Sequence, residues 1–98
     1  MPDTPELYRA LSDPTRRLVL DELAERGRQT VFELCARLAG KHGITSTRQA
    51  ISQHLDVLEA AGLVRTERVG RYRYLHLEPG PLGEIIARWP TPPLEETS

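Results

Sequence analysis

The sequence has few of the features that mark secreted, membrane-bound or disulfide-stabilised proteins. Its 98 residues include one cysteine, one phenylalanine and one tryptophan. A single cysteine excludes an internal disulfide bond and fits a reducing compartment. No apolar run is long enough to cross a bilayer, and the first ten residues lack the basic and apolar regions of a signal peptide. We therefore expect a cytoplasmic protein that makes no contact with a membrane.

An excess of charge of one sign is also missing. Lys and Arg number 13 against 14 for Asp and Glu, which gives a formal net charge of −1. Any affinity for nucleic acid must therefore depend on where the charges lie. The sequence shows no nucleophile–base pair, phosphate-binding glycine loop or carboxylate constellation in a suitable context. We expect no enzymatic activity and no cofactor.

The most informative stretch is residues 45–62, TSTRQAISQHLDVLEAAG. It opens with three hydroxyl residues, any of which can cap a helix; Ser46 and Gln49 match a capping box, and Gly62 suits the C-terminal end. Apolar residues recur at helical spacing: Ile51, Leu55 and Leu58. The opposite face carries short polar side chains: Gln49, Ser52, Gln53 and Asp56. Because amides and hydroxyls both donate and accept hydrogen bonds, this face predicts a helix that reads base edges in the major groove of DNA.

After this helix the pattern changes to two strands, 63–69 and 72–77, joined by a tight turn at Gly70 and Arg71. The hairpin carries a charge of +3 from four arginines and one glutamate: Arg65, Arg68, Arg71, Arg73 and Glu67. A basic hairpin directly after a recognition helix is the arrangement of a winged helix. The wing of such a domain contacts phosphates or enters a minor groove.

Helical patterns account for most of the remaining chain. We predict helices over 6–11, 14–26, 30 to about 40, and 79–89, with Asp13 and Thr30 as N-terminal caps. Residues 1–5 are expected to be frayed, and the proline-rich acidic segment 90–98 to be disordered. The predicted fold is mainly α with a small β-hairpin (α+β). It is a single winged helix-turn-helix domain over residues 6–89, with about five helices and a two-stranded wing.

The first and last helices each carry an apolar stripe. The stripes consist of Leu7 and Leu11 at one end of the chain and Leu82, Ile85, Ile86 and Trp89 at the other. The second stripe could close the core of a monomer. Three central helices leave little room to bury both stripes, so we favour a homodimer in which an isologous two-fold interface covers them.

Three segments taken together resemble the ArsR-type family of winged-helix transcriptional regulators: DPTRRLVLDEL, RQAISQHLDVLEAAGLV and RYRYLHLEP. The resemblance covers roughly residues 7–89. It implies a homodimer, built from the first and last helices, that represses transcription by occupying operator DNA as a pair. The family's recognition-helix motif maps onto Thr47, Arg48, Gln49, Ser52, Gln53 and His54. Its wing maps onto 68–73, which makes Arg68, Arg71 and Arg73 the expected wing contacts to double-stranded DNA.

The sequence departs from the family pattern in two places. The connector over residues 39–45 is several residues longer than usual. The metal-sensing motifs are also missing, because Cys35-Ala36-Arg37 keeps only the first of two cysteines and residues 79–89 contain no histidine. We therefore expect no metal site. A small-molecule effector could bind between the terminal helices, or there is none, and the sequence does not choose.

Several of these features have a plainer interpretation. The polar helix face could be merely solvated, and the wing arginines could only keep a hairpin edge soluble. The alternative function is then a winged-helix module that binds another protein and not DNA. Cys35 is expected to fill core space rather than to sense oxidants, while His54 fits either a phosphate contact or a half-buried ring. Tyr72 and Tyr74 are expected to pack onto the helices rather than to stack on bases.

Overall fold

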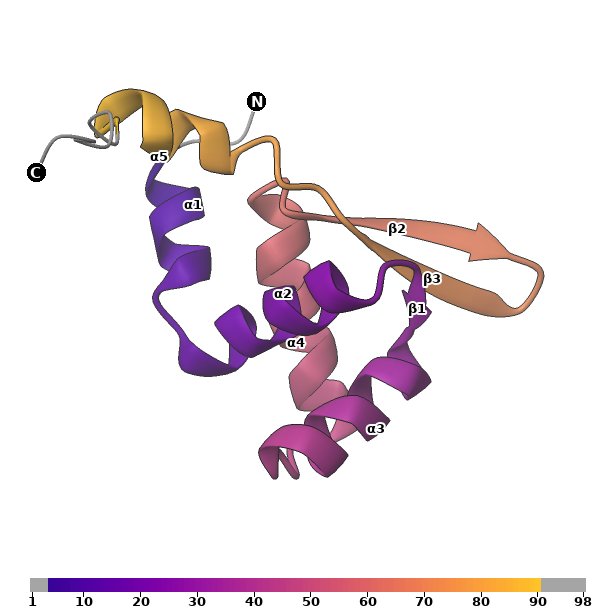
Figure 1. Cartoon of the computed structure of the whole chain (residues 1–98). Coiled ribbons are helices and arrows are strands. Elements are labelled where there is room, and N and C mark those ends of the chain that lie inside the picture. The colour runs from indigo at the N-terminus through magenta and orange to yellow at the C-terminus, as the bar shows by residue number, and fades with distance from the viewer. Residues whose placement is uncertain (1–3, 91–98) are drawn as a thin grey trace, which may run out of the picture.

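Helices make up most of the chain, and a small sheet projects from one end of the helical body (Figure 1). The computed structural model describes residues 4–90. Its elements, in chain order, are α1 (Thr4–Leu11), α2 (Pro14–Glu25), β1 (Gln29–Thr30), α3 (Val31–His42), α4 (Arg48–Ala60), β2 (Val64–Val69), β3 (Tyr72–Leu77) and α5 (Leu82–Arg88). This order and arrangement confirm the predicted winged helix-turn-helix fold.

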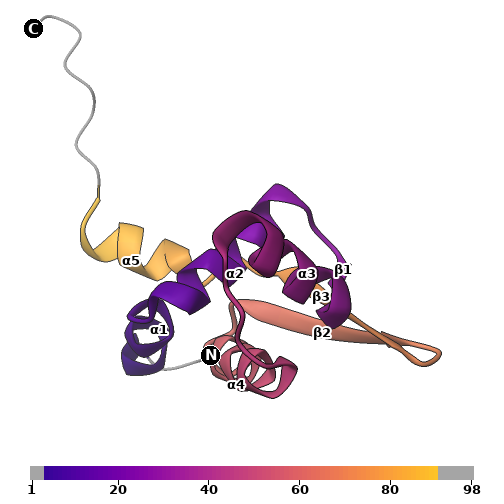
Figure 2. The same cartoon turned by 90° about the horizontal axis from the view of Figure 1, so that it is seen from below.

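The two ends of the molecule are made of different elements. The β2–β3 hairpin extends away from the body on one side, while α1 and α5 lie together on the opposite side (Figures 1 and 2). The rings of Tyr8 and Trp89, whose centroids are 6.2 Å apart, join these two terminal helices. Helix α4 lies between the two ends (Figure 1). The wing and the terminal helices are therefore separate surfaces.

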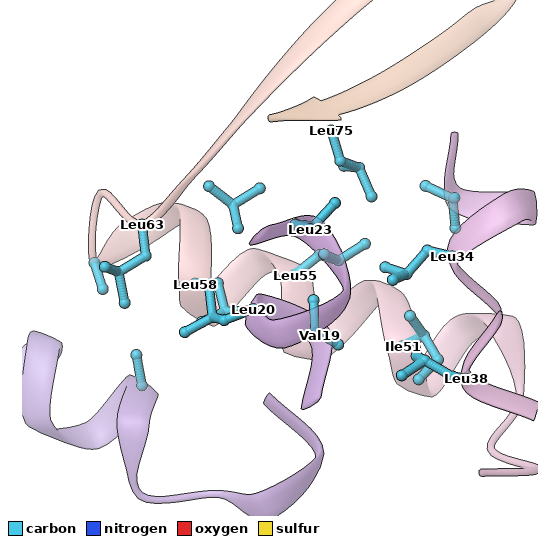
Figure 3. Packing of buried hydrophobic residues seen from close by; sticks show 14 of the residues in the cluster. Val19, Leu20, Leu23, Leu34, Leu38, Ile51, Leu55, Leu58, Leu63 and Leu75 are labelled. Atoms are coloured by element: carbon cyan, nitrogen blue, oxygen red, sulfur yellow. The ribbon is translucent and has the colours of Figure 1, made fainter. Parts of the chain in front are cut away.

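A single apolar core holds α2, α3 and α4 together beneath the sheet (Figure 3). Its fully buried members come from every layer: Leu23, Leu34, Leu38, Ile51, Leu55, Leu58, Leu63 and Leu75. Burying one such side chain contributes about 1.5–3 kcal/mol. The predicted apolar face of α4 is confirmed, and its burial fixes which face of this helix points outward. On α2 the core takes Val19, Leu20 and Leu23, whereas Ala24 is exposed.

Side-chain caps define where three helices begin. The Asp13 carboxylate accepts a hydrogen bond from the Arg16 N–H at 3.0 Å, and Thr30, the other predicted cap, forms a capping box with Glu33. At α4 the Thr47 hydroxyl accepts from the Ala50 N–H at 3.0 Å. The predicted capping box of Ser46 and Gln49 is therefore wrong, because the last of the three hydroxyl residues is the cap.

The start of α1, the end of α3 and the number of strands differ from the prediction. Helix α1 begins at Thr4, so residues 4 and 5 are helical and not frayed. Helix α3 continues through Gly40 to His42 and ends at Gly43, whose φ of +66° suits a residue without a side chain. The sheet has three strands in the order β1-β3-β2, where we expected two. Residues 1–3, and the tail from 91 to 98 that we expected to be disordered, lie outside the described residues.

A buried carboxylate ties α2 to α3. The Glu22 side chain, only 2% exposed, is bonded to Arg37 Nε at 2.8 Å, Lys41 Nζ at 2.9 Å and His42 Nε2 at 2.9 Å. Hydrogen bonds from His42 and Lys41 outweigh the opposing effect of burial, and they lower the pKa of Glu22 from its usual 4.5 to about 2. We call Glu22 and these three partners the Glu22 cluster. It holds the two helices that precede α4 in a fixed arrangement.

Candidate nucleic-acid interface

The outward face of α4 is the polar face that the sequence predicts. The Arg48, Gln49 and Gln53 side chains are exposed and Ser52 is half-buried, while the apolar residues on the other side of the helix are in the core. Neither amide side chain is buried. Four side chains with hydrogen-bonding groups are thus presented together on one helix.

Thr47 and His54, also predicted to contact DNA, have partners within the protein. The Thr47 hydroxyl is engaged as the cap of α4. His54 is half-buried, and its Nδ1 lies 3.2 Å from Arg16 Nη1. Because a guanidinium only donates hydrogen bonds, Nδ1 must be the acceptor. This contact favours the interpretation of His54 as a packed ring over that of a phosphate ligand.

Arg16 makes two further contacts. Its Nε donates to the Ala10 carbonyl at 2.9 Å and its Nη2 donates to the Arg9 carbonyl at 2.8 Å. Both carbonyls belong to the C-terminal turn of α1. One side chain on α2 therefore links the end of α1 to His54 on α4.

The wing is a tight hairpin with unequal arginines. Val69 pairs with Tyr72, which leaves Gly70 and Arg71 as the turn, and Gly70 has a φ of +61°. Arg68 and Arg71 are exposed. Arg73 is half-buried with its Nη2 3.9 Å from a Glu59 carboxylate oxygen.

Other wing charges are also neutralised within the protein. Arg65 Nε donates to Glu78 at 2.9 Å, and Glu67 is bonded to His76 at 2.8 Å. Within residues 4–90, Arg48, Arg68 and Arg71 form no ion pair with a carboxylate. Of the four arginines in the wing, the two without a carboxylate partner, Arg68 and Arg71, therefore lie near its tip.

A cavity of about 390 Å³ lies between α4 and the wing. It is lined by residues 30–32 at the start of α3, by Arg48 and Ser52 of α4, and by residues 71–73 of the wing. We call it the α4–wing groove. Two large rings lie beside its arginines, since Phe32 is 72% exposed and Tyr72 is 58% exposed. The groove thus combines positive charge with apolar surface.

The aromatic residues of this region were not predicted correctly. Tyr72 does not pack onto the helices, because strand alternation gives the core-facing position to Leu75. The ring of Tyr74 instead lies under the Arg28 guanidinium, 4.0 Å from its centroid. Phe32 carried no signal in the sequence, since its position next to α4 depends on how α3 docks.

The terminal helices leave less apolar surface uncovered than expected. Leu7 is 1% exposed and belongs to the core of the protomer, so the prediction of Leu7 as an interface residue is wrong. Helix α1 docks closely enough against α2 and α4 to bury it. Leu11, Leu82 and Ile85 are partly buried against the same core. Ile86 and Trp89 remain 61% and 59% exposed.

Cys35 is half-buried against the core cluster. Burial raises the pKa of its thiol, an effect that the charge of Arg48 only partly opposes. A thiol that stays protonated is a poor target for oxidants, which favours the core-filling interpretation. In the part of the chain that the structure describes, no three His, Cys, Asp or Glu side chains are grouped to hold a metal ion. No helix in that part is long and apolar enough to cross a membrane.

Comparisons with known proteins place this geometry among regulators. A family described as a helix-turn-helix domain matches residues 11–67. The HTH-type transcriptional regulator YuzN of Bacillus subtilis is 49% identical over 83 residues, which cover 85% of this chain and 90% of YuzN. The transcriptional repressor SdpR of the same species is 30% identical, with 82% and 81% covered. The crystal structure of the ArsR family transcriptional regulator RHA00566 superposes with a TM-score of 0.73 at 33% identity, covering 90% of this chain and 88% of that one.

Proposed function

Because this chain belongs to the ArsR-type family of helix-turn-helix transcriptional regulators, we propose that it binds a palindromic operator as a homodimer and represses transcription. The observation that carries this proposal is the exposed amide and hydroxyl face of α4, placed beside a wing whose tip holds unpaired arginines. Repression in particular is supported by the similarity to the repressor SdpR.

Sequence discrimination is assigned to the outward face of α4. Gln49 and Gln53 can each form two hydrogen bonds with an adenine edge, and Ser52 can donate or accept. A good bidentate pair of this kind discriminates against the wrong base by about 1–3 kcal/mol. Thr47 and His54 have a supporting role in this proposal, since both are bonded within the protein.

Affinity is assigned to the arginines. Arg48, Arg68 and Arg71 are exposed and would neutralise phosphates, which releases counterions and makes binding depend on salt. Arg73 lies close to Glu59, so it must exchange that partner for a phosphate and should contribute less.

The surface proposed for dimerisation is the outer side of α1 and α5. Ile86 and Trp89 are its exposed apolar residues, with Leu11, Leu82 and Ile85 partly buried behind them. A second copy docked there by a two-fold axis would cover both exposed residues. The two recognition helices would then lie about 34 Å apart, one turn of B-DNA, or a multiple of that distance.

The proposal includes no catalysis and no cofactor, and it locates the protein in the cytoplasm. An unknown small-molecule effector between the terminal helices remains an optional part of it. The competing function is a winged-helix module that binds another protein. The unpaired arginines favour the DNA-binding function, because they lie on α4 and on the wing, where phosphate contacts would flank the polar face of α4.

The test is selection of bound duplexes from a random library, followed by binding at several salt concentrations. We expect enrichment of an inverted repeat whose half-sites are about 10 base pairs apart, and an affinity that falls steeply with salt. Sedimentation should give a dimer, and Trp89→Ala should weaken it. A folded protein without enrichment and without salt-sensitive affinity would instead support the protein-binding alternative.

A further inference from the structure

We propose that the α4–wing groove seats one segment of the DNA sugar–phosphate backbone, with Phe32 and Tyr72 in contact with its sugars. This inference rests on the proposed function and adds a binding site with two aromatic contact residues. The arginines of the groove would hold the phosphates of the same segment. The argument combines the position of the groove with its chemistry.

The position follows from the geometry of duplex DNA. A helix in the major groove and a wing in the adjacent minor groove are separated by one strand of backbone. That strand must pass through the gap between helix and wing. In this protein the gap is the α4–wing groove, with Arg48 and Ser52 on one side and residues 71–73 on the other.

The chemistry of the groove matches alternating charged and apolar units. Arg48 and Arg71 are exposed donors from two different elements, and the Ser52 hydroxyl lies between α4 and the wing. Phe32 and Tyr72 then supply apolar surface beside these donors. A backbone strand presents phosphates and the C–H faces of deoxyribose in turn, so both kinds of lining residue have a partner.

The exposure of the Phe32 side chain is the strongest indication that the groove binds a partner. It is the only phenylalanine in the sequence, yet it is 72% exposed and lies at a concave surface. Single exposed apolar residues are common, but two exposed rings that share a groove with three arginines form a composite surface. Covering the rings would bury their apolar surface away from water. This burial adds affinity that does not depend on charge.

This assignment predicts a behaviour that separates the rings from the arginines. Loss of Phe32 removes no charge and no base contact. Affinity should therefore fall equally for every duplex, while the dependence on salt stays the same. Loss of an arginine, in contrast, reduces the salt dependence.

The experiment compares Phe32→Ala and Tyr72→Ala with the wild type on two duplexes, the selected operator and a scrambled sequence, at three or more salt concentrations. We expect affinity to fall about three- to tenfold on both duplexes, as loss of one contact side chain implies, with an unchanged salt slope. Phe32→Tyr should bind like the wild type because it keeps the ring. Circular dichroism should report unchanged folding, since both rings are largely exposed.

Val69→Ala is the matched control. Val69 is an exposed apolar residue of the same wing, 45% exposed, and it does not line the groove. We expect this variant to lose less affinity than Phe32→Ala. A loss equal to that of Phe32→Ala would overturn the assignment to the groove.

Three further results would overturn the proposal. They are unchanged affinity in Phe32→Ala, a loss confined to the selected operator, which would indicate a base contact, and a reduced salt slope. All three require a wild-type protein that binds DNA. If the wild type binds no duplex at all, the proposed function itself has failed, and the two failures are therefore distinguishable.

Discussion

The Glu22 cluster and the tip of the wing use charge in opposite ways. In the cluster a buried carboxylate contacts Arg37, Lys41 and His42 from α3. Near the wing tip, Arg68 and Arg71 project from the protein without a carboxylate partner among the described residues. The comparison shows that the pairing of charges, and not their number, distinguishes groups that stabilise this fold from groups that the proposed function assigns to DNA.

Physical cost explains the difference. Removing a carboxylate from water costs several kcal/mol unless cations and hydrogen bonds replace the lost hydration. An exposed guanidinium stays hydrated and carries no such cost, so it can remain unpaired until a phosphate binds. Mutations in the two regions should therefore change different measurements.

The largest effect is expected for Glu22→Gln. Loss of the negative charge removes the buried partner of Arg37 and Lys41, which keep only the exposed Glu25, so the free energy of unfolding should fall by about 3 kcal/mol. Urea denaturation at neutral pH measures this change. Affinity for DNA, measured well below the midpoint of unfolding, should not change.

Glu25→Gln is the matched control for that prediction. Glu25 is paired with the same Arg37 and Lys41, but its side chain is 58% exposed. Exposed pairs contribute little, so its stability should change by less than about 1 kcal/mol. Equal losses in the two variants would show that burial of Glu22 has no special role.

Acid should weaken the cluster selectively. Glu22 has a folded pKa of about 2 against a usual value of 4.5. Since the folded pKa is depressed, its contribution is fully present above about pH 4.5 and is lost as the pH falls toward 2. The difference in unfolding free energy between wild type and Glu22→Gln should shrink from pH 6 to pH 3. A difference that stays constant over this range would contradict the assignment.

Gln53→Ala is expected to change specificity and not stability. Its exposed amide is assigned to a base edge. The free-energy preference for the operator over a scrambled duplex should therefore fall by about 1–3 kcal/mol. Binding to scrambled DNA should stay within error of the wild type. A uniform loss on both duplexes would mean that the amide contacts the backbone.

The smallest effect is expected for Arg71→Ala. Affinity for all duplexes should weaken together, and the slope of log affinity against log salt should flatten by about 0.9, the value for one phosphate. Arg65→Ala is the comparison variant, because Arg65 is already paired with Glu78 at 2.9 Å. It should leave the slope unchanged. If Arg71→Ala lost affinity relative to the wild type by the same factor at every salt concentration, the phosphate contact would be contradicted.

The sequence predicted the features that depend on local patterns. The spacing of Ile51, Leu55 and Leu58 identified the buried face of α4 and therefore its polar face. The turn at Gly70 and the alternation of the flanking strands predicted the wing. In these cases the side-chain period alone determines which residues face outward.

Features that depend on distant contacts were missed. Glu22 is buried only because Arg37, Lys41 and His42 approach it from another helix, and Leu7 is buried only because α1 docks on the core. Strand β1 has two residues, too few to show any alternation. The groove needs three elements in place before Phe32 and Tyr72 can be seen to share it.

Arg16 has a mechanical consequence. Its guanidinium bridges the last turn of α1 and the ring of His54, so a shift of α1 would also move α4. If two copies associate through their terminal helices, this contact would transmit the geometry of the dimer interface to α4 in both copies. Such a dimer would hold its two α4 helices at a fixed separation. It should bind poorly to operators in which the spacing between half-sites is one base pair longer.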